Sequence, residues 1–505
     1  MVRNSLVIAG ATGFVGHAAA QRLASRPNRD FDIVGLTRGR KEATGAWDRL
    51  VSCDLFSLKD VEQALAGARY ALYLVHSMLP SARLVQGDFA DLDLICADNF
   101  GRAAKKAGVE QIVYLGGLIP DASDLSEHLA SRLEVEKALE AHGVPVSTLR
   151  AGMVVGAGGS SFEILTRLVR RLPAMVLPRW SENRCQTIDL DTVASLIDRT
   201  VGDRETYGQT YDIGGPDVLR YRDMIQIVGE ELGTPRKSVG VPVLTPKLSR
   251  LWVSLITGAP KTLVAPLIES LQHDMVCRDR RLQAAKDLPG LTFRDSVSRA
   301  LGKVVDKSGE RRARSTTNGG AEVVEKAPAA YRAAPRAPTT GVRSVQRIPL
   351  PKGHDAEWAA LEYMRWLPRG VWPQMRVEVD NARTSTFFLR GSKRPLLVLT
   401  FAGDRSASDR QLFYVTGGIL ARKTKRGRLE FRITPDGEHL LTAIHDFEPR
   451  LPWLIYRFSQ AIVHRWVMRR FGRHLASIAP RGKSPEANFP PDARRIVESP
   501  STDSG

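Results

Sequence analysis

The chain has few cysteines and no long apolar run. Four cysteines occur in 505 residues, and none forms a C-x-x-C pair or lies near a pair of histidines. This scarcity argues against a disulfide framework and a zinc site, so we expect no metal and a reducing, cytoplasmic environment. No stretch of about 18 apolar residues occurs, so no transmembrane helix is predicted. The short apolar run near the start leads into a glycine-rich loop, which is typical of a first strand and not of a signal peptide.

The positive charge is uneven along the chain. The formal net charge is +18, and residues 346–480 carry roughly +11 of it against roughly +3 for residues 1–305. This basic C-terminal region indicates either solubility with an arginine-rich composition or an anionic partner, such as lipid headgroups or an acidic ligand. Peripheral membrane contact is therefore one hypothesis. No nucleic-acid partner is expected, because neither aromatic interleaving nor a helix-turn-helix pattern accompanies the basic residues.

Composition and periodicity divide the chain into four segments. Residues 1–305 begin with alternating strand and helix patterns, which predict an α/β fold with a Rossmann-type doubly wound parallel sheet and substrate-side insertions. Residues 306–345 are rich in Ala, Pro, Arg, Ser, Thr and Gly and predict a flexible linker. Residues 346–480 predict a basic α+β domain with an antiparallel sheet, and residues 481–505 a disordered tail.

The expected elements follow from apolar periodicity. In the first domain we expect strands at Leu6–Ala9, Ile33–Thr37, Leu50–Cys53, Ala71–Val75, Gln111–Leu115 and Val146–Arg150, and helices at Val15–Ser25 and Leu84–Ala107. In the C-terminal domain a helix carrying Trp358 and Trp366 comes first, and a long helix from Trp453 to about His474 comes last. Between them we expect strands at Met375–Val379, Ser385–Arg390, Leu396–Phe401, Leu412–Val415, Leu429–Thr434 and Leu440–Asp446.

A glycine-rich loop connects the first expected strand to the first helix. In Gly10-Ala-Thr-Gly13-Phe-Val-Gly16 the first glycine allows a tight turn, the second lets the backbone approach a pyrophosphate, and the third permits close helix–strand packing. This strand–loop–helix context predicts dinucleotide binding. The residues expected to contact the cofactor here are Gly10, Thr12, Gly13, Phe14, Val15 and Gly16.

The end of the second strand indicates which dinucleotide is bound. It carries Arg38 and Arg40 and no acidic residue, so we expect NADP, with both guanidinium groups on the 2′-phosphate. The alternative is a solvated basic loop with NAD bound. Asp54 and Leu55 follow the third strand and are expected on the adenine side, although Asp54 can equally cap the next helix. Val75 and His76, at the end of the fourth strand, complete the predicted cofactor site.

Several motifs together resemble a known superfamily. They are Gly10–Gly16, Cys53–Leu55, Tyr73–Met78, Tyr114–Leu118, Leu149–Gly156 and Ile213–Tyr221. With these motifs, residues 5–300 resemble the extended and atypical short-chain dehydrogenase/reductase superfamily, near its NmrA-like branch. More narrowly, the chain is similar to bacterial NAD(P)-binding proteins that append a C-terminal domain resembling the helix-grip, polyketide-cyclase-like fold. The resemblance implies a cavity for a hydrophobic small molecule in that domain.

The chain departs from the superfamily where catalysis is expected. The resemblance implies a serine after the fifth strand and a Tyr-x-x-x-Lys pair in the next helix, but Gly116-Gly117 and His128-Leu-Ala-Ser-Arg132 occupy these places. His128 can replace the proton donor at neutral pH, with Arg132 one helical turn on supporting it. The alternatives are a surface position for His128 and an ion pair of Arg132 with Glu136 or Glu127.

Four further residues are expected in the substrate pocket. They are Ser77, Gly117, Arg150 and Trp180. Three of them have a structural alternative: Ser77, like His76, can serve structure or cofactor packing, Arg150 can form a buried ion pair, and Trp180 can pack in the core. Tyr114 is expected in the core.

The closing helix combines arginines with an apolar stripe. Leu454, Phe458, Ile462 and Trp466 form the stripe, and Arg457, Arg465, Arg469 and Arg473 accompany it. Either the stripe packs across the sheet while the arginines are solvated, or the helix presents a basic amphipathic surface to anionic lipid.

Two hypotheses of function follow. The first is an NADP-dependent oxidoreductase of atypical mechanism that acts on a carbonyl or quinone-like small molecule. The second is a non-catalytic NADP-binding sensor or assembly factor whose C-terminal domain engages a protein partner or a membrane. A third reading is a lipid-handling protein in which the C-terminal cavity dominates.

Overall fold

The computed structural model describes residues 4–39, 42–76, 84–122, 125–171, 174–235, 237–240, 270–305, 311–313, 341–370, 375–422, 424 and 426–478. Two compact units divide the chain. The first consists of Met1–Leu79 and Leu92–Ala337, and the second of Pro80–Asp91 and Pro338–Gly505. None of the helices in these described ranges is long and apolar enough to cross a membrane.

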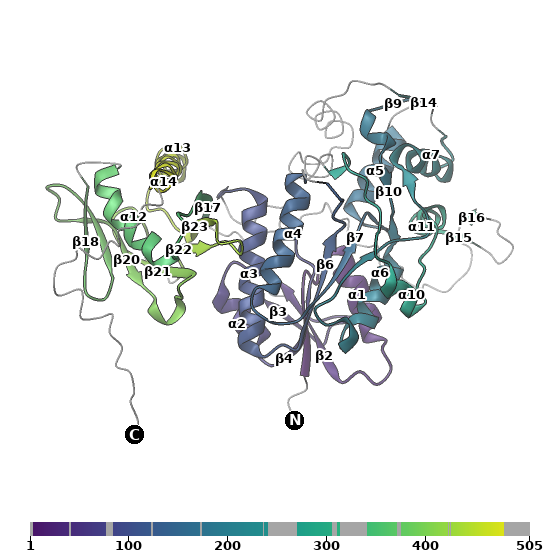
Figure 1. Ribbon diagram of the computed structural model, residues 1–505, viewed down its shortest axis with the longest axis horizontal. Helices are drawn as coiled ribbons and strands as arrows, with labels where there is room; N and C mark the ends of the chain where they lie inside the picture. Colours follow the sequence, from purple (N-terminus) through teal and green to yellow (C-terminus); the bar gives the residue numbers. More distant parts are fainter. Residues whose placement is uncertain are drawn as a thin grey trace. The chain divides into compact units, whose positions relative to one another are not determined.

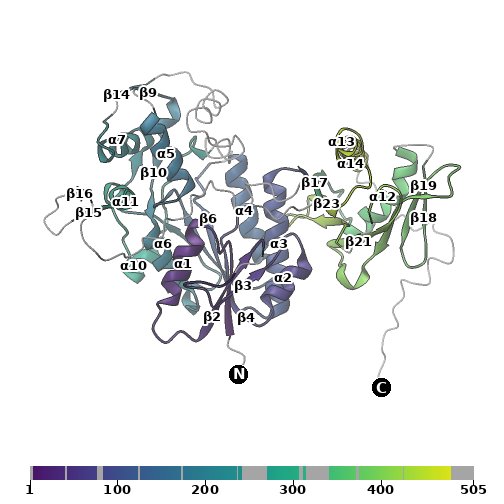
Figure 2. The same ribbon diagram turned by 180° about the vertical axis from the view of Figure 1, so that it is seen from behind.

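The first unit is built on a seven-stranded parallel sheet in the order β12-β7-β6-β4-β1-β2-β3. The strands are β1 (Asn4–Ala9), β2 (Phe31–Thr37), β3 (Arg49–Ser52), β4 (Ala68–Tyr73), β6 (Gln111–Gly117), β7 (Val146–Ala151) and β12 (Thr210–Ile213). Helices α1 (Phe14–Ala24) and α6 (Leu190–Thr200) cover one face of the sheet, and α2 (Leu58–Leu65), α3 (Phe89–Ala107) and α4 (Glu127–Glu140) cover the other (Figures 1 and 2). The α/β, doubly wound prediction is confirmed.

Apolar runs produce these central strands because both faces of the sheet are buried. Leu6, Ile8, Ile33, Leu72 and Val113 pack in one cluster, and none of these five side chains is more than 1% exposed. Each predicted strand of the first domain is present, within three residues of its expected ends. Tyr114 is fully buried in β6, as expected for a core residue.

The helix predicted over Leu84–Ala107 begins later than expected. Residues Leu84–Gln86 form strand β5, which pairs in parallel with β17 (Val342–Pro349) of the second unit, and α3 starts at Phe89. Gly87 separates the strand from the helix, and a Cβ there would lie only 2.9 Å from the Val345 carbonyl oxygen. The local sequence favours a helix, but pairing with a strand distant in sequence overrides it.

Residues after β7 form a lobe at the carboxyl ends of the sheet strands (Figure 1). It contains the helices α5 (Ser160–Arg171), α7 (Tyr221–Glu231) and α11 (Phe293–Ala300), a 3-10 turn at Arg179–Glu182, and three short strand pairs. Helix α10 (Arg281–Lys286) lies instead beside α6 and β12, where Leu282 joins the core of the sheet. The pairs are β8 (Val154–Val155) with β11 (Ile188–Asp189), β10 (Arg184–Cys185) with β13 (Leu219–Arg220), and β9 (Ala174–Leu177) with β14 (Lys237–Gly240). Its own apolar cluster includes Phe162, Met224 and Phe293. Strands β15 (Lys303–Val305) and β16 (Arg311–Ala313) pair after it.

The second unit is a long mixed sheet with helices packed against it. Its strand order is β18-β19-β20-β21-β22-β23-β17-β5, antiparallel except for the β17–β5 pair. The strands are β18 (Met375–Val379), β19 (Ser385–Leu389), β20 (Pro395–Phe401), β21 (Arg410–Gly417), β22 (Arg428–Ile433) and β23 (His439–Phe447). Helix α12 (Ala356–Gly370) follows β17, and α13 (Trp453–Phe458) and α14 (Gln460–Ser477) close the unit. Gly437, at φ +72°, makes the predicted turn between β22 and β23.

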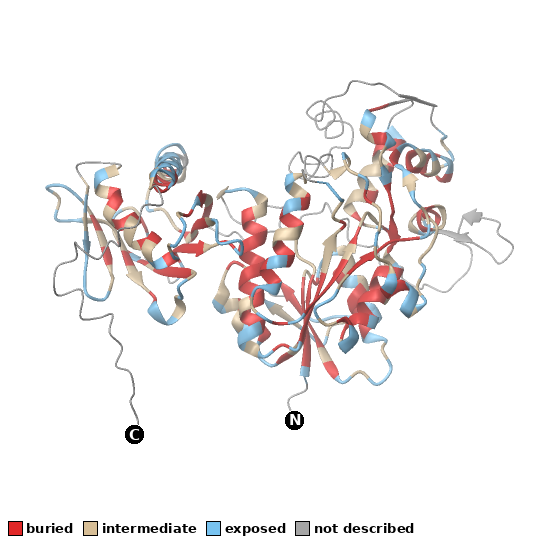
Figure 3. Cartoon of the chain, viewed as in Figure 1, coloured by how far each residue is buried: buried red, intermediate tan, exposed pale blue. Residues whose placement is uncertain are grey.

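Three expectations for this region are corrected. A strand, β17, precedes the first helix, so residues 342–345, which the composition assigned to the linker, lie in the sheet. The closing helix is not continuous, because Ser459 leaves helical geometry at φ −125° and ψ −85° and separates α13 from α14. Finally, the stripe expected to cross the sheet faces outward at Phe458, Ile462 and Trp466. The buried side of α14 is instead formed by Val467, Met468, Phe471 and Leu475. Figure 3 shows the opposite, exposed side of this helix in pale blue.

Candidate functional site

The glycine loop has the geometry that a pyrophosphate requires. Gly10 adopts φ +89°, and its carbonyl oxygen accepts a hydrogen bond from the Gly13 N–H at 2.9 Å. A Cβ at Gly16 would lie 2.3 Å from that same oxygen, so only glycine fits there. Helix α1 starts directly after Gly13 with no side-chain cap and no acidic residue in its first turn. Its first N–H groups are therefore available to an anion, and the residues present fit a dinucleotide.

The other loop residues divide between exposed and packing positions. Thr12 and Gly13 are exposed, and Val15 packs against the core of the sheet. Phe14 supports the loop that follows β8, because a Cβ at Gly156 would lie 2.8 Å from the Phe14 Cζ atom. Phe14 thus joins the glycine loop to the upper lobe.

The ribose and adenine side is only partly described. Arg38 is exposed directly after β2, and it forms no ion pair with a described residue. The buried Thr37 hydroxyl donates to the Gly39 carbonyl oxygen at 2.5 Å and fixes the turn. Arg40 lies outside the described residues, so its predicted role stays a prediction.

Asp54 does not cap the helix that follows it. Ser57 is the N-cap of α2, and its hydroxyl accepts the Asp60 N–H at 3.3 Å. The Asp54 carboxylate accepts the Phe56 N–H at 3.3 Å. The Leu55 carbonyl accepts the buried Asn99 amide of α3 at 2.9 Å. The capping alternative for Asp54 is wrong, and a role beside adenine stays a prediction.

Three polar side chains from separate elements meet at the carboxyl end of β4. The Asp93 carboxylate of α3, 1% exposed, lies 2.8 Å from His76 Nδ1 and accepts the Arg132 guanidinium of α4 at 2.9 Å. His76 Nδ1 also lies 2.9 Å from that guanidinium. A protonated Nδ1 donates to Asp93, whereas an unprotonated Nδ1 accepts from Arg132. The His128 ring packs beside His76, with centroids 5.1 Å apart. We call His76, Asp93, Arg132 and His128 the polar cluster.

Both histidines of the polar cluster are neutral at pH 7. Burial, reinforced by the charge of Arg132, lowers the pKa of His76, although Asp93 opposes the shift. Burial, together with His76 and Arg132, lowers the pKa of His128 to about 3. A positive charge on His128 beside Arg132 in a partly desolvated site is unfavourable, and the predicted role of His128 as proton donor stays a prediction. Neutral His128 can still donate or accept a hydrogen bond.

A cavity of about 380 Å³ opens beside the polar cluster. Its wall includes Leu74, Gly116, Gly117, Met153, Leu165, Trp180, Tyr221 and Ile225, together with His76, His128 and Arg132. Leu74 also borders the glycine loop, since a Cβ at Gly10 would lie 2.8 Å from its carbonyl oxygen. The cavity and the glycine loop thus share a wall at the carboxyl edge of the sheet, where doubly wound folds bind ligands.

Two of the four predicted pocket residues meet at this cavity, together with both predicted catalytic residues and one residue predicted to contact the cofactor. His76, His128, Arg132, Gly117 and Trp180 all line it. His128 is half-buried and is not a surface residue, and Arg132 pairs with Asp93 instead of Glu136 or Glu127. Trp180 also packs edge-on against Tyr221.

Two other positions are not in the cavity wall, and a third lies outside the described residues. Arg150 forms a two-point ion pair with Glu136, at 3.1 and 2.7 Å, and is not in the cavity wall. Its substrate role stays a prediction, as does that of Ser77, which lies outside the described residues. Val75 is half-buried after β4.

Asp93 was missed by reasoning from the sequence. A signal was available, since Asp93 lies between Leu92 and Leu94 in an otherwise apolar part of its helix. A carboxylate at such a position has to be paired when it is buried.

Comparisons with known proteins agree with this architecture. Residues 6–214 match the model of the NAD dependent epimerase/dehydratase family. The chain is 26% identical over 149 residues to "Auxiliary protein GraX" of Staphylococcus aureus, which covers 29% of this chain and 44%, less than half, of that protein.

Solved structures similar to this chain are reductases and related proteins. One is the Citrobacter sp. triphenylmethane reductase complexed with NADP(H), 20% identical with a TM-score of 0.46, covering 59% of this chain and 99% of that chain. Another is an NADPH-dependent quinone oxidoreductase of Escherichia coli complexed with NADPH, 18% identical with a TM-score of 0.46 and the same coverage. The family match covers the sheet, the glycine loop and the polar cluster, so the nucleotide-binding part of the first unit is similar to the NAD dependent epimerase/dehydratase family.

Proposed function

We propose that this protein is an NADPH-dependent oxidoreductase that reduces a carbonyl or quinone-like small molecule. One observation carries the proposal: the glycine loop and a cavity that holds a polar cluster share Leu74 as a common wall. A nucleotide held by the loop would therefore reach the cavity with its nicotinamide end. The cavity volume of about 380 Å³ falls within the usual range of small-molecule sites.

The cofactor preference rests on charge. Arg38 is exposed where dinucleotide folds contact the adenine ribose, and the chain places no acid beside it. A guanidinium forms strong paired hydrogen bonds to a phosphate, and an acidic residue here would instead favour the free hydroxyls of NAD. When bound, NADPH would supply a hydride to the substrate.

The substrate class rests on the cavity wall. Most of the wall is apolar, from Leu74, Met153, Leu165 and Ile225 among others, and Trp180 offers an aromatic ring. A flat apolar molecule suits this wall, while its oxygen can face His128, which donates a hydrogen bond in its neutral form. Asp93 and Arg132 hold His76 in place. Because neither histidine is charged at pH 7, the proton that completes the reduction comes from water.

The first test is nucleotide binding. NADPH and NADH are titrated into the wild type, Arg38→Ala and the control Arg204→Ala, an exposed arginine of the same unit, while nicotinamide fluorescence is followed. We expect tight NADPH binding that weakens about tenfold or more in Arg38→Ala only, as loss of a charge-assisted contact implies. Absence of binding by either nucleotide would overturn the proposal.

The second test is turnover. Oxidation of NADPH is followed with a panel of quinones and aromatic carbonyl compounds, in the wild type and in His76→Ala and Trp180→Ala. Activity that the two variants reduce without weakening NADPH binding would support the assigned cavity. Activity unchanged by both variants would place the reaction elsewhere.

A non-catalytic NADPH sensor is the second candidate. It is favoured by the glycines at positions 116 and 117, by the neutral His128, and by the neutralisation of Arg132 by Asp93. These features leave no charged proton donor at the cavity. Selective NADPH binding with no turnover across the panel would favour this candidate over the oxidoreductase.

We further propose that the second unit is a helix-grip domain that takes a hydrophobic small molecule. The strand–helix–six-strand–helix order supports this, with β17 beside β23. A cavity of about 280 Å³ lies between the sheet and α14, lined by apolar residues such as Phe387, Leu399, Leu429 and Met468. Displacement of a fluorescent fatty-acid probe, compared between the wild type and Leu399→Trp, tests it.

A further inference from the structure

Exposed apolar side chains concentrate on one short stretch of the second unit. Of the nine large hydrophobic residues that are exposed in the described part of the chain, five lie within twelve positions. They are Ile455, Phe458, Ile462, Val463 and Trp466. Phe458 is 68% exposed and Trp466 41% exposed. Scattered apolar residues on a surface need no explanation, but a contiguous group marks a binding surface.

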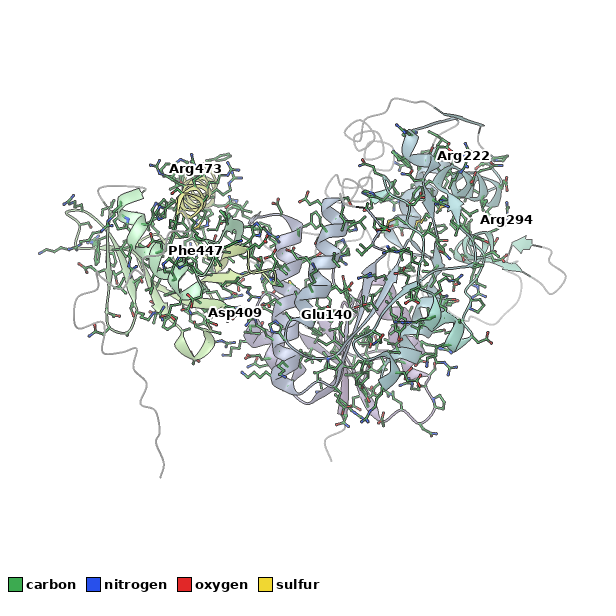
Figure 4. All side chains as sticks on the ribbon, in the orientation of Figure 1. Glu140, Arg222, Arg294, Asp409, Phe447 and Arg473 are labelled. Carbon is green, nitrogen blue, oxygen red and sulfur yellow. The ribbon has the colours of Figure 1, made fainter. Side chains whose placement is uncertain are left out.

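Arginines surround this apolar group. Arg465, Arg469, Arg470 and Arg473 are all exposed on α14, and none of them forms an ion pair with a described residue. Figure 4 shows Arg473 on the outer side of the helix. Residues 453–477 contain no aspartate or glutamate. The Arg470 guanidinium lies 5.5 Å from the centre of the Trp466 ring, so charge and aromatic surface are continuous. We call the five apolar residues and these four arginines the outer face of α13–α14.

Apart from Val463, which also borders the cavity between the sheet and α14, the outer face is separate from the packing face of the same helix. Val467, Met468, Phe471 and Leu475 of α14 are buried in the core of the second unit. Ile462, Trp466 and Arg470 recur every four residues on the opposite side. The buried side chains already hold α14 against the core of the second unit. The outer face is therefore not needed for packing within this unit.

We propose that the outer face of α13–α14 lies on an anionic lipid surface. Phe458, Ile462 and Trp466 would enter the boundary between headgroups and acyl chains, and the arginines would contact lipid phosphates. Aromatic and aliphatic side chains mixed with arginines match this boundary, where one side is apolar and the other is charged and wet. The proposal does not depend on the nucleotide or on the substrate proposed for the first unit.

The charge of the face argues against a second copy of the chain. A symmetric dimer through this surface would bring like arginines together without an acidic residue of the face to neutralise them. An anionic bilayer instead attracts each arginine and accepts the apolar side chains between them.

The test is cosedimentation of the full-length protein with vesicles. Vesicles of phosphatidylcholine alone are compared with vesicles in which roughly one third of the lipid is phosphatidylglycerol, at low and high salt. We expect binding to the anionic vesicles only, weakened by salt. Each basic residue near such a surface contributes about fivefold in affinity, so Arg469→Glu with Arg473→Glu should weaken binding at least about twentyfold. Phe458→Ser with Trp466→Ser should also release the protein.

Matched controls make the result decisive. Arg204→Glu with Val218→Ser changes an exposed arginine and an exposed valine of the first unit and should leave vesicle binding unchanged. Circular dichroism and NADPH titration show that each variant remains folded, and NADPH binding reports separately on the proposed function. Absence of vesicle binding, or equal binding by the outer-face variants, would overturn the proposal. A dimer seen by ultracentrifugation that Trp466→Ser dissociates would identify a second copy as the occupant and overturn it as well.

Discussion

Two cavities in the described part of this protein differ in the charged groups beside their walls, although apolar residues form most of both walls. The cavity of the first unit, about 380 Å³, borders a buried aspartate, an arginine and two histidines. That of the second unit, about 280 Å³, is lined mainly by apolar residues, with the buried ring of His464 among them. Charged groups are expensive to bury, and they persist where they position a reacting molecule. The comparison therefore supports the proposal of a reaction in the first cavity and of apolar ligand binding in the second.

The largest expected effect comes from removing the charge that holds the polar cluster together. Asp93→Asn leaves Arg132 buried at 8% exposure without its carboxylate, and breaking a buried pair in this way costs roughly 3–5 kcal/mol. We expect a free energy of unfolding lowered by that amount in urea titrations, and a loss of any turnover.

A matched exposed pair provides the control for Asp93. Asp30 lies 3.2 Å from Arg69 and its side chain is 66% exposed. Exposed pairs contribute about 1 kcal/mol or less, so Asp30→Asn should change stability by no more than that. Equal effects of the two variants would contradict the assignment of Asp93 as the centre of the cluster.

The next largest effect is the pH dependence of the unfolding free energy that the buried histidines of the two cavities cause. Burial lowers the pKa of His128 to about 3 and that of His464 to about 4, so unfolding allows each ring to take up a proton below pH 6.5. The stabilisation is complete above about pH 6.5 and falls by roughly 1.4 kcal/mol per pH unit as the pH drops towards the folded pKa. Between pH 7 and pH 5 each site should lose about 2 kcal/mol.

Hydrogen exchange can separate the two contributions. Protection of the α4 amides reports on His128, and protection of the α14 amides reports on His464. His464→Leu should remove the acid sensitivity of α14 and leave that of α4, whereas His128→Gln should do the reverse. A uniform response of both helices to either variant would show that the two histidines do not titrate as local groups.

How far the sequence predicts this molecule depends on whether the signal is local. The strands Leu6–Ala9 and Met375–Val379 are predicted within a few residues of their ends. The continuous apolar run of the first and the alternation of apolar and polar residues in the second both report on burial directly. The strand at Leu84–Gln86 was mistaken for helix because its partner, β17, lies more than 250 positions away. No pattern in a short window can report such pairing.

The candidate site shows the same division. The glycine loop can be predicted from the sequence because its strand–loop–helix context is local. The neutral state of His128 cannot, since it follows from burial and from Arg132 and His76 in the folded chain. Asp93 and Arg132 are 39 positions apart, and only the fold brings them to 2.9 Å.

Gly116 and Gly117 occupy the place beside the first cavity where a serine was expected, and this allows a gain-of-function test. A Cβ at Gly117 would meet only Arg132 Cγ at 3.6 Å, so a serine fits, while one at Gly116 would press on the Tyr114 ring at 3.0 Å. A hydroxyl at this place can donate to a substrate oxygen, and we expect Gly117→Ser to raise the rate of carbonyl reduction roughly tenfold. Rates are measured at saturating NADPH with Gly117→Ala as control. A rate equal to that of Gly117→Ala would show that the hydroxyl does not face the substrate.

The smallest expected change in stability comes from the serines at the starts of the helices beside the two cavities. Ser126 caps α4, which carries His128 and Arg132, and its hydroxyl accepts the Leu129 N–H at 3.4 Å. Ser459 precedes α14 but makes no side-chain cap, since its hydroxyl donates to the Ile455 carbonyl oxygen instead. Replacing a serine cap by alanine costs about 1 kcal/mol, so Ser126→Ala should lower the unfolding free energy by that amount and Ser459→Ala by a few tenths.

Thermal unfolding of the two variants, each against the wild type, measures this difference. Because α4 holds two members of the polar cluster, Ser126→Ala should also weaken turnover, while Ser459→Ala should leave turnover unchanged. If Ser459→Ala proved the more destabilising, the break between α13 and α14 would depend on the Ser459 side chain. The Ser459 side chain would then stabilise the start of α14 as much as Ser126 stabilises the start of α4. The helices beside the two cavities would not differ in how their first turns are held.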